Sequence, residues 1–271
     1  MGKVWFVGAG PGAADLITVR GSRLLGEAGA VLYAGSLVSR AALEWTAPGC
    51  EIADSAGMTL AEIADWLRQR ADRHATVVRL QTGDPTLYGA LVEMARPLDR
   101  AGVAVGIVPG VSSAMASAAA AGESLTLPEV TQTVILTRIE GRTPMPEREA
   151  LESLAAHGCT LCIFLSVDRI AAVAAALRAA GWLESAPIAV VEKATWPGQE
   201  RVLRATLADI AERCAAAGIR RQAMILASPA LGARERDAPE VSRLYDAAFS
   251  HGFRRAAAPG GLDPETGNPL P

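Results

Sequence analysis

The chain has 271 residues, half of them apolar, and a formal net charge of −3. This length allows one large domain or two of ordinary size, and the slightly acidic balance argues against a nucleic-acid-binding surface spread over the whole protein. No basic segment followed by an apolar stretch precedes the first predicted strand, and no apolar run reaches membrane-spanning length. We therefore expect a cytoplasmic protein that binds neither nucleic acid nor membrane.

Short apolar runs alternate with amphipathic stretches through the first 230 or so residues, a pattern typical of repeated strand–helix units. In the first half, strands are predicted near residues 4–7, 31–33, 76–80 and 103–108. Helices are predicted near residues 16–28, 60–73, 87–100 and 112–121. Few aromatic residues and many Ala, Val and Leu residues suit helices packed on a buried parallel sheet.

The pattern changes after residue 121, where a connecting segment of about residues 122–129 follows. Strands resume near residues 131–136, 160–165, 188–191, 202–205 and 223–226. Two α/β lobes fit this better than a single sheet, so we predict lobes at residues 1–115 and 116–231, each a mostly parallel sheet flanked by helices. The tail, 232–271, is expected to be largely irregular, apart from a short docked helix that residues 241–249 could form.

Cysteines and histidines give no sign of a metal site. Cys159 and Cys162 form a C-x-x-C pair inside a predicted strand, where alternation would send the two sulfurs to opposite faces. A second ligand pair is missing from the sequence, and the three histidines show no ligand spacing. Buried structural thiols are therefore the favoured interpretation, and no metal is expected.

A glycine-rich turn, Gly8-Ala9-Gly10-Pro11-Gly12, follows the first strand. With Ala13 it matches the G-x-G-x-x-G/A spacing of a dinucleotide fingerprint, so an NAD-dependent oxidoreductase is one alternative. However, the second strand ends without the acidic residue that would hold a ribose, and Pro11 has no amide to donate. A tight turn without any ligand is a further alternative.

Two more loops follow strands of the first lobe, at residues 82–89 and 109–113. The carboxyl ends of parallel strands meet at one edge of a sheet, so these loops and the glycine-rich turn can contact a single ligand. Asp84 before Pro85, and Ser112 before an alanine-rich stretch, are also typical helix caps. In the second lobe, residues 193–197 follow a strand in the same way.

Together these segments resemble the tetrapyrrole methylases, an S-adenosylmethionine-dependent family of cobalamin and siroheme synthesis. The family's marks are a G-x-G-P-G turn, a G-D-P loop followed by an aromatic residue and glycine, a P-G-[IV]-[ST]-[SA] loop and an A-T-x-P segment. All four occur here in order, at residues 8–12, 83–89, 109–113 and 194–197. Segments 32–38, 131–144 and 193–197 resemble the precorrin-4 C11-methyltransferase branch, which produces precorrin-5 in cobalamin biosynthesis. Segments 242–245 and 249–253 resemble its aerobic-pathway version.

The resemblance implies a two-lobed fold with the ligand cleft between the lobes, a homodimer, and S-adenosyl-L-methionine as methyl donor, with S-adenosyl-L-homocysteine as product. It leaves the catalytic residue unassigned, with Asp84 as a candidate for orienting the donor or assisting proton loss. It places ten residues against the donor: Pro11, Thr82, Gly83, Asp84, Leu87, Ser112, Ser113, Leu165, Ala194 and Ala223.

The implied substrate is a polycarboxylate tetrapyrrole. We expect Arg138 and Arg142 to bind its carboxylates and Gly10 to contribute to the floor beneath it. A surface ion-pair cluster of the two arginines with Glu140 is an equal alternative. Other possible activities are cobalt-precorrin-4 or another precorrin C-methylation, methylation of ribosomal RNA or of a modified histidine by an enzyme of the same fold, and non-catalytic tetrapyrrole carriage.

Overall fold

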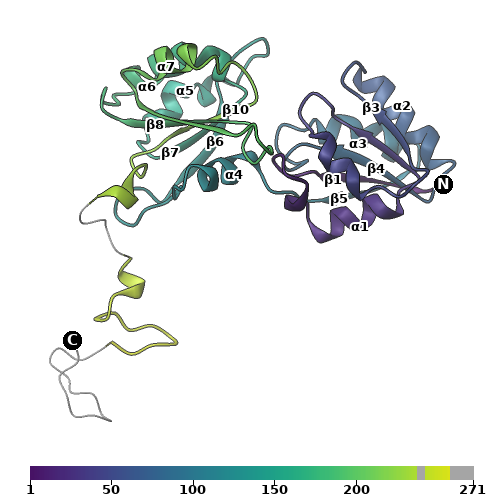
Figure 1. Cartoon of the computed structure of the whole chain (residues 1–271), viewed down its shortest axis with the longest axis horizontal. Coiled ribbons are helices and arrows are strands. Elements are labelled where there is room, and N and C mark those ends of the chain that lie inside the picture. Colours follow the sequence, from purple (N-terminus) through teal and green to yellow (C-terminus); the bar gives the residue numbers. More distant parts are fainter. Residues whose placement is uncertain (237–241, 257–271) are drawn as a thin grey trace.

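The computed structural model describes residues 1–236 and 242–256, which form two α/β lobes followed by an extended tail (Figure 1). Each lobe contains a five-stranded sheet within these described residues. Helices flank the sheet in both lobes. The predicted two-lobed α/β fold is confirmed.

The N-terminal lobe is built on a parallel sheet with strand order β3-β2-β4-β1-β5. Its strands are β1 (Lys3–Gly8), β2 (Ala30–Tyr33), β3 (Glu51–Asp54), β4 (Thr76–Gln81) and β5 (Ala104–Val108). Its helices are α1 (Val19–Glu27), α2 (Leu60–Ala71) and α3 (Leu91–Arg100). One face packs against α1 through Leu25, and the other against α2 and α3 through Leu67 and Met94. The mostly parallel sheet predicted for this lobe is present.

Strand β3 was not predicted from the sequence. Its four residues alternate between half-buried and exposed, and Ile52 is 43% exposed, because β3 is an edge strand. Such a segment lacks the continuous apolar run of a central parallel strand. The following helix, α2, has a clear local signal, since Thr59 and Glu62 form a capping box at its first turn.

The C-terminal lobe has strand order β6-β7-β10-β8-β9. Its strands are β6 (Val134–Arg138), β7 (Thr160–Phe164), β8 (Pro187–Glu192), β9 (Arg201–Thr206) and β10 (Ala223–Ala227). Its helices are α4 (Ser113–Ala120), α5 (Leu151–Ala155), α6 (Ile170–Ala179) and α7 (Ile210–Ala216). The chain enters this lobe through α4, where Ala114 and Ala118 pack with Leu226 of the second sheet. The lobe boundary predicted between residues 115 and 116 thus falls inside α4.

Strand direction in this lobe differs from the expectation of a mostly parallel sheet. Only β6 and β7 pair in parallel, whereas β10 is antiparallel to both β7 and β8, and β8 is antiparallel to β9. Loop 193–200 joins β8 to β9 without a crossover helix, so these two strands must run in opposite directions. Strand β10 then inserts between β7 and β8, which makes the sheet mixed.

The C-x-x-C cysteines lie on opposite faces of this sheet, as predicted. Cys159 belongs to the core formed with α5, α6 and α7, and Cys162 to the core formed with α4. Both side chains are buried, and burial raises the pKa of each thiol, that of Cys162 to about 12. They are structural thiols.

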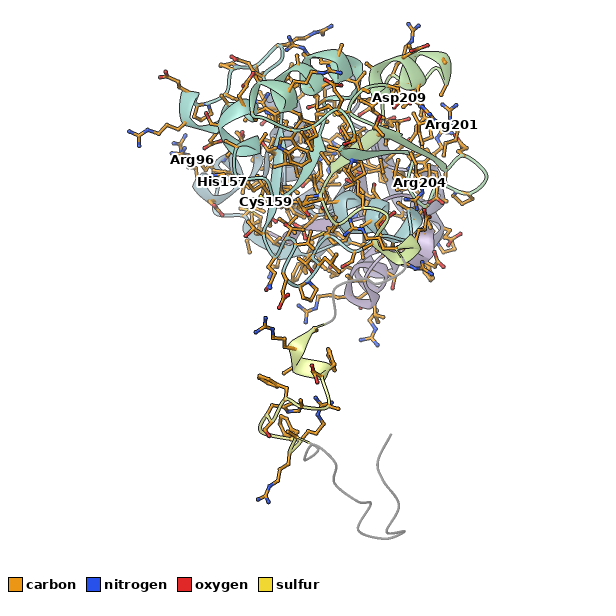
Figure 2. All side chains as sticks on the ribbon, turned by 90° about the vertical axis from the view of Figure 1, so that its left-hand side faces the viewer. Arg96, His157, Cys159, Arg201, Arg204 and Asp209 are labelled. Carbon is orange, nitrogen blue, oxygen red and sulfur yellow. The ribbon has the colours of Figure 1, made fainter. Side chains whose placement is uncertain are left out.

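The tail leads away from both lobes, a course visible in two perpendicular views (Figures 1 and 2). An ion pair between Arg243 and Glu129, with an N–O distance of 2.8 Å, connects it to the C-terminal lobe. Residues Arg243–Tyr245 form a single 3-10 turn, and Leu244, Tyr245 and Phe249 are exposed. The docked helix considered for residues 241–249 is therefore absent from the part of this segment that is described, 242–249; residue 241 lies outside it.

Candidate active site

The glycines of the three N-terminal motif loops pack directly against one another. A Cβ atom on Gly8 would lie 2.5 Å from the Gly83 carbonyl oxygen and 2.6 Å from the Gly110 Cα. Gly10, at φ +76°, exchanges backbone hydrogen bonds with Gly83, with N–O distances of 2.8 and 3.3 Å. Side chains would separate the loops, so their close approach accounts for these glycines without a bound phosphate.

Asp84 fastens two of these loops together. Its Oδ1 accepts hydrogen bonds from the Thr86 amide at 2.8 Å and the Thr86 hydroxyl at 2.6 Å, and its Oδ2 accepts one from the Gly110 amide at 2.9 Å. Partial burial raises the pKa of Asp84, but the three donors outweigh burial and the net pKa is lowered. A carboxylate in this state is a weak base, which favours a positioning role over proton abstraction.

The glycine-rich turn also contacts the A-T-x-P segment of the other lobe. The Ala13 amide donates to Thr195 Oγ1, and Trp196 Nε1 donates to the Pro11 carbonyl oxygen, both at 3.1 Å. A Cβ atom on Gly12 would overlap the Trp196 ring. Gly12 is therefore a packing requirement of the junction between the lobes.

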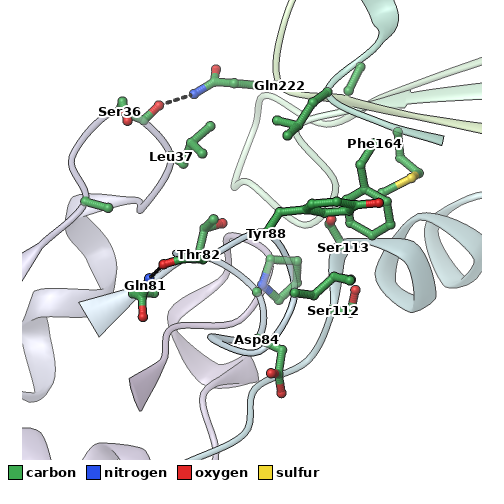
Figure 3. Close-up of a pocket in the computed structure, with 18 of the residues that line it drawn as sticks. Ser36, Leu37, Gln81, Thr82, Asp84, Tyr88, Ser112, Ser113, Phe164 and Gln222 are labelled. Carbon is green, nitrogen blue, oxygen red and sulfur yellow. Dashed lines mark hydrogen bonds between the residues drawn. The ribbon is translucent and has the colours of Figure 1, made fainter. Parts of the chain in front are cut away.

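Two further contacts join the lobes around the same site (Figure 3). Gln222 Nε2 donates to the Ser36 carbonyl oxygen at 3.0 Å. Tyr88, from the loop after β4, lies beside Phe164 at the end of β7, with ring centroids 5.3 Å apart. Burial raises the pKa of Tyr88, and the positive charge of Arg138 opposes this. The aromatic pair spans the space between the lobes.

These loops surround a cavity of about 690 Å³ that both lobes line. All ten residues predicted to contact the methyl donor line it: Pro11, Thr82, Gly83, Asp84, Leu87, Ser112, Ser113, Leu165, Ala194 and Ala223. Its volume is typical of a site for a small organic ligand. Four loops far apart in the sequence thus meet at one site, as their position after strands predicted.

Backbone strain is concentrated around this cavity. Among the described residues, seven other than glycine have a left-handed φ, and five of these line the cavity: Tyr88, Ala90, Leu165, Lys193 and Gln222. Each such residue costs roughly 1–3 kcal/mol, and strain of this kind gathers at functional sites. The strain therefore marks this cavity as a candidate functional site.

The predicted substrate residues lie outside the cavity lining. Arg138 donates from its guanidinium to the carbonyl oxygens of Thr143, at 3.3 Å, and Pro144, at 2.8 Å, and so holds its own loop. Arg142 is exposed. Gly10 lies beneath the lining through its pairing with Gly83. Their contacts with substrate remain predictions.

Four basic residues that we did not select from the sequence do line the cavity: Arg79, Lys193, Arg220 and Arg221. Lys193 donates to Gln199 Oε1 at 2.6 Å and lies over the Trp196 ring. The carboxylates in the lining are Asp84 and Asp168. A protein of net negative charge thus presents excess positive charge at this site, which suits an anionic ligand. Of these four residues, Arg79 could have been recognised from the sequence, because it is a charged residue within an apolar strand.

Comparison with known proteins decides the family. A model of the tetrapyrrole (corrin/porphyrin) methylases matches residues 3–211. The chain belongs to this family. It is a methyltransferase, and the matched residues include the glycine-rich turn at residues 8–12.

Individual relatives cover almost the whole chain. A cobalt-precorrin-4 C(11)-methyltransferase of Priestia megaterium is 49% identical over 93% of this chain and 98% of its own length. A precorrin-4 C(11)-methyltransferase of Pseudomonas aeruginosa is 45% identical with the same coverage.

Solved structures agree with these relatives. A cobalt precorrin-4 methyltransferase structure has a TM-score of 0.82 and 50% identity, covering 84% of this chain and 95% of its own. A uroporphyrin-III C-methyltransferase of Thermus thermophilus complexed with S-adenosylhomocysteine has a TM-score of 0.71 and 32% identity, covering 85% of this chain and 99% of its own. No helix among the described residues here is long and apolar enough to cross a membrane.

Proposed function

We propose that this protein transfers a methyl group from S-adenosyl-L-methionine to C11 of precorrin-4, giving precorrin-5 in cobalamin biosynthesis. The observation that carries the proposal is the meeting of four motif loops, and of all ten donor-binding candidates, at one cavity between the lobes. The name of the 45% identical relative supports this substrate, and the names of the 49% and 45% identical relatives both support this carbon.

The cavity wall has buried polar atoms that can pair with a bound ligand. Gln81 Oε1 and Ser117 Oγ are buried and have no hydrogen-bond partner among the described residues, and both side chains belong to the lining. Buried polar groups are nearly always paired, so these atoms are best explained as partners of a bound molecule. The donor, when bound, supplies a methyl group on a sulfonium centre.

The protein's task in this reaction is alignment. A ring carbon of the tetrapyrrole forms the new C–C bond as the C–S bond breaks, and the electron pair of that bond stays on sulfur. Holding both reactants in line supplies about 7–11 kcal/mol without an acid or base in that step. The glycine-packed loops and the Asp84 hydrogen bonds fix the cavity floor, and the Tyr88–Phe164 pair fixes its span.

Cobalt-precorrin-4 is a second candidate substrate, favoured by the name of the 49% identical relative and by that of the structure with a TM-score of 0.82. Purified protein should be given labelled donor with each macrocycle, and the products analysed by mass spectrometry and NMR. The larger kcat/KM identifies the substrate. A methyl group on a carbon other than C11 would refute the assignment.

Two binding measurements separate this function from the other classes. Isothermal titration calorimetry should show binding of S-adenosylhomocysteine and none of NADH, whereas the opposite pattern contradicts the methyltransferase assignment. Macrocycle binding without methyl transfer would indicate a carrier. We also propose a homodimer in the cytoplasm, following the family resemblance, and light scattering of the purified protein tests the dimer.

A further inference from the structure

Arg79 is a buried guanidinium that no carboxylate of the described residues binds. It lies on the central strand β4 and is 5% exposed. Nη1 donates to the Ser55 hydroxyl at 2.8 Å and the Leu32 carbonyl oxygen at 3.4 Å, both neutral acceptors. Nε is buried and has no hydrogen-bond partner within residues 1–236 and 242–256. The positive charge is therefore only partly satisfied by the protein.

Within the part of the chain that the structure describes, the carboxylate whose charge acts on Arg79 is Asp54, and Asp54 has other partners. Asp54 Oδ1 accepts hydrogen bonds from the backbone amides of Gly35, at 3.0 Å, and Ala56, at 2.9 Å. Burial lowers the pKa of Arg79 to about 10, and the negative charge of Asp54 only partly offsets this. Arg79 still carries its charge at neutral pH. Retaining an unpaired buried cation is costly unless a further anion arrives.

Arg79 lies where a ligand can reach it. It lines the cavity together with Gln81, two residues further along β4, so both side chains leave the same face of the sheet about 7 Å apart. Gln81 Nε2 donates to the Gly89 carbonyl oxygen at 2.6 Å, while its Oε1 has no hydrogen-bond partner among the described residues. Ile63 of α2 and Met94 of α3 line the same N-lobe end of the cavity. This end is thus an apolar recess with one cationic donor and one free acceptor.

We propose that Arg79 binds a carboxylate of the tetrapyrrole at the N-lobe end of the cavity, and that Gln81 Oε1 accepts a hydrogen bond from the same ligand. The inference rests on the proposed function, which supplies a polycarboxylate macrocycle. A guanidinium whose Nη1 is already held by Ser55 is pre-oriented, so little side-chain freedom is lost when the carboxylate binds. The methionine carboxylate of the methyl donor has the same chemistry, and the experiment separates the two sources.

The test measures binding of two stable macrocycles that differ only in charge. Uroporphyrin III provides ionised carboxylates, and its peramide replaces each of them with a neutral carboxamide. Fluorescence titration should show that Arg79→Gln weakens uroporphyrin binding at least tenfold, about 1.4 kcal/mol, and leaves peramide binding within twofold. Arg79→Lys, which keeps the charge but loses the planar guanidinium, should weaken uroporphyrin binding by a smaller factor.

Arg70→Gln is the matched control, because Arg70 forms an ion pair with Glu51, at 2.5 Å, in the same lobe and outside the cavity lining. It should leave both macrocycle affinities unchanged. If Arg79 only ties β2 to β3, its variants weaken both macrocycles equally or neither, and the proposal is overturned. If Arg79→Gln does not fold, an unchanged acid-to-amide preference in Arg79→Lys overturns it as well.

Calorimetry with S-adenosylhomocysteine completes the design. Its dissociation constant should stay within twofold in the Arg79 variants. A loss confined to this ligand would assign Arg79 to the donor's carboxylate and overturn the tetrapyrrole assignment. Failure of wild-type protein to bind it at all would refute the proposed methyl transfer, while the preference for the charged macrocycle would still report on Arg79 separately.

Discussion

Replacing Asp84 by asparagine tests whether this carboxylate holds the cavity floor. In the wild-type protein three donors from two loops converge on Asp84. Asparagine keeps one oxygen acceptor and places an NH2 group where the other oxygen was. If the NH2 group replaces Oδ2, it faces the Gly110 amide; if it replaces Oδ1, it faces the Thr86 amide, while the Thr86 hydroxyl can turn and accept from it. The remaining hydrogen bonds lose the negative charge that strengthened them.

The expected loss of stability follows from these hydrogen bonds. A hydrogen bond to a charged group contributes about 1.5–3 kcal/mol, and an unmet donor adds a desolvation cost. Asp84 is only partly buried, so we expect Asp84→Asn to lower the free energy of unfolding by about 2 kcal/mol, the lower end of that range. Urea unfolding measures it, and calorimetry should show weaker S-adenosylhomocysteine binding. Asp99→Asn, at an exposed site on α3, is the control and should change stability by less than about 0.5 kcal/mol.

The lowered pKa of Asp84 also predicts in which direction the stability difference changes with pH. Because the pKa of Asp84 is lower in the folded than in the unfolded chain, its stabilising contribution is complete at neutral pH and is lost as the pH falls through the folded-state pKa. The stability difference between wild type and Asp84→Asn should therefore shrink below about pH 4. Equal stability of the two proteins at pH 7, or a difference that grows with acid, would refute the proposed positioning role.

Two further experiments, one a substitution and one a chemical modification, test the packing. Gly12→Ala places a methyl group against the Trp196 ring at the lobe junction, and we expect it to cost about 1–3 kcal/mol of unfolding free energy and to shift tryptophan fluorescence. Gly57→Ala, which meets no atom within 4 Å, should do neither, and equal effects of both would contradict the argument. Iodoacetamide at pH 8 should alkylate the half-buried Cys50 well before Cys162, whose pKa burial raises to about 12, as measured by peptide mass spectrometry; equal rates would refute the burial.

Most of the fold was predictable because its signals are local. Apolar runs and capping residues mark strands and helices within a few positions of themselves, and Thr59 and Glu62 are an example. Strand direction is a property of pairs, so the mixed sheet of the second lobe could not follow from the apolar run of β10 alone. Strand β3 was missed because an edge strand needs only one apolar side chain in two, and four residues are too few to show that alternation.

The candidate site was likewise predictable from the sequence only in part. Motif loops can be recognised in a sequence from their turn-forming residues. The structure brings them together because parallel strands end at one edge of the sheet. Arginines that can bind the ligand were harder to predict, since a sequence does not show whether an arginine already has hydrogen-bond partners within the protein. Arg138 is held by carbonyl oxygens of its own loop, whereas Arg79, on the cavity side of β4, has an Nε that no described residue pairs with. Only the hydrogen-bond partners distinguish them.

This difference explains how an acidic protein can hold an acidic macrocycle. Net charge acts over the whole surface and is screened within about 10 Å, but a ligand in the cavity responds to the nearest unsatisfied groups. There the negative charge of Asp84 is met by three hydrogen-bond donors, while the guanidinium of Arg79 is met by two neutral acceptors. The local balance is therefore more positive than a count of lining residues suggests, and a carboxylate reaching β4 gains a partner that the folded chain has left available.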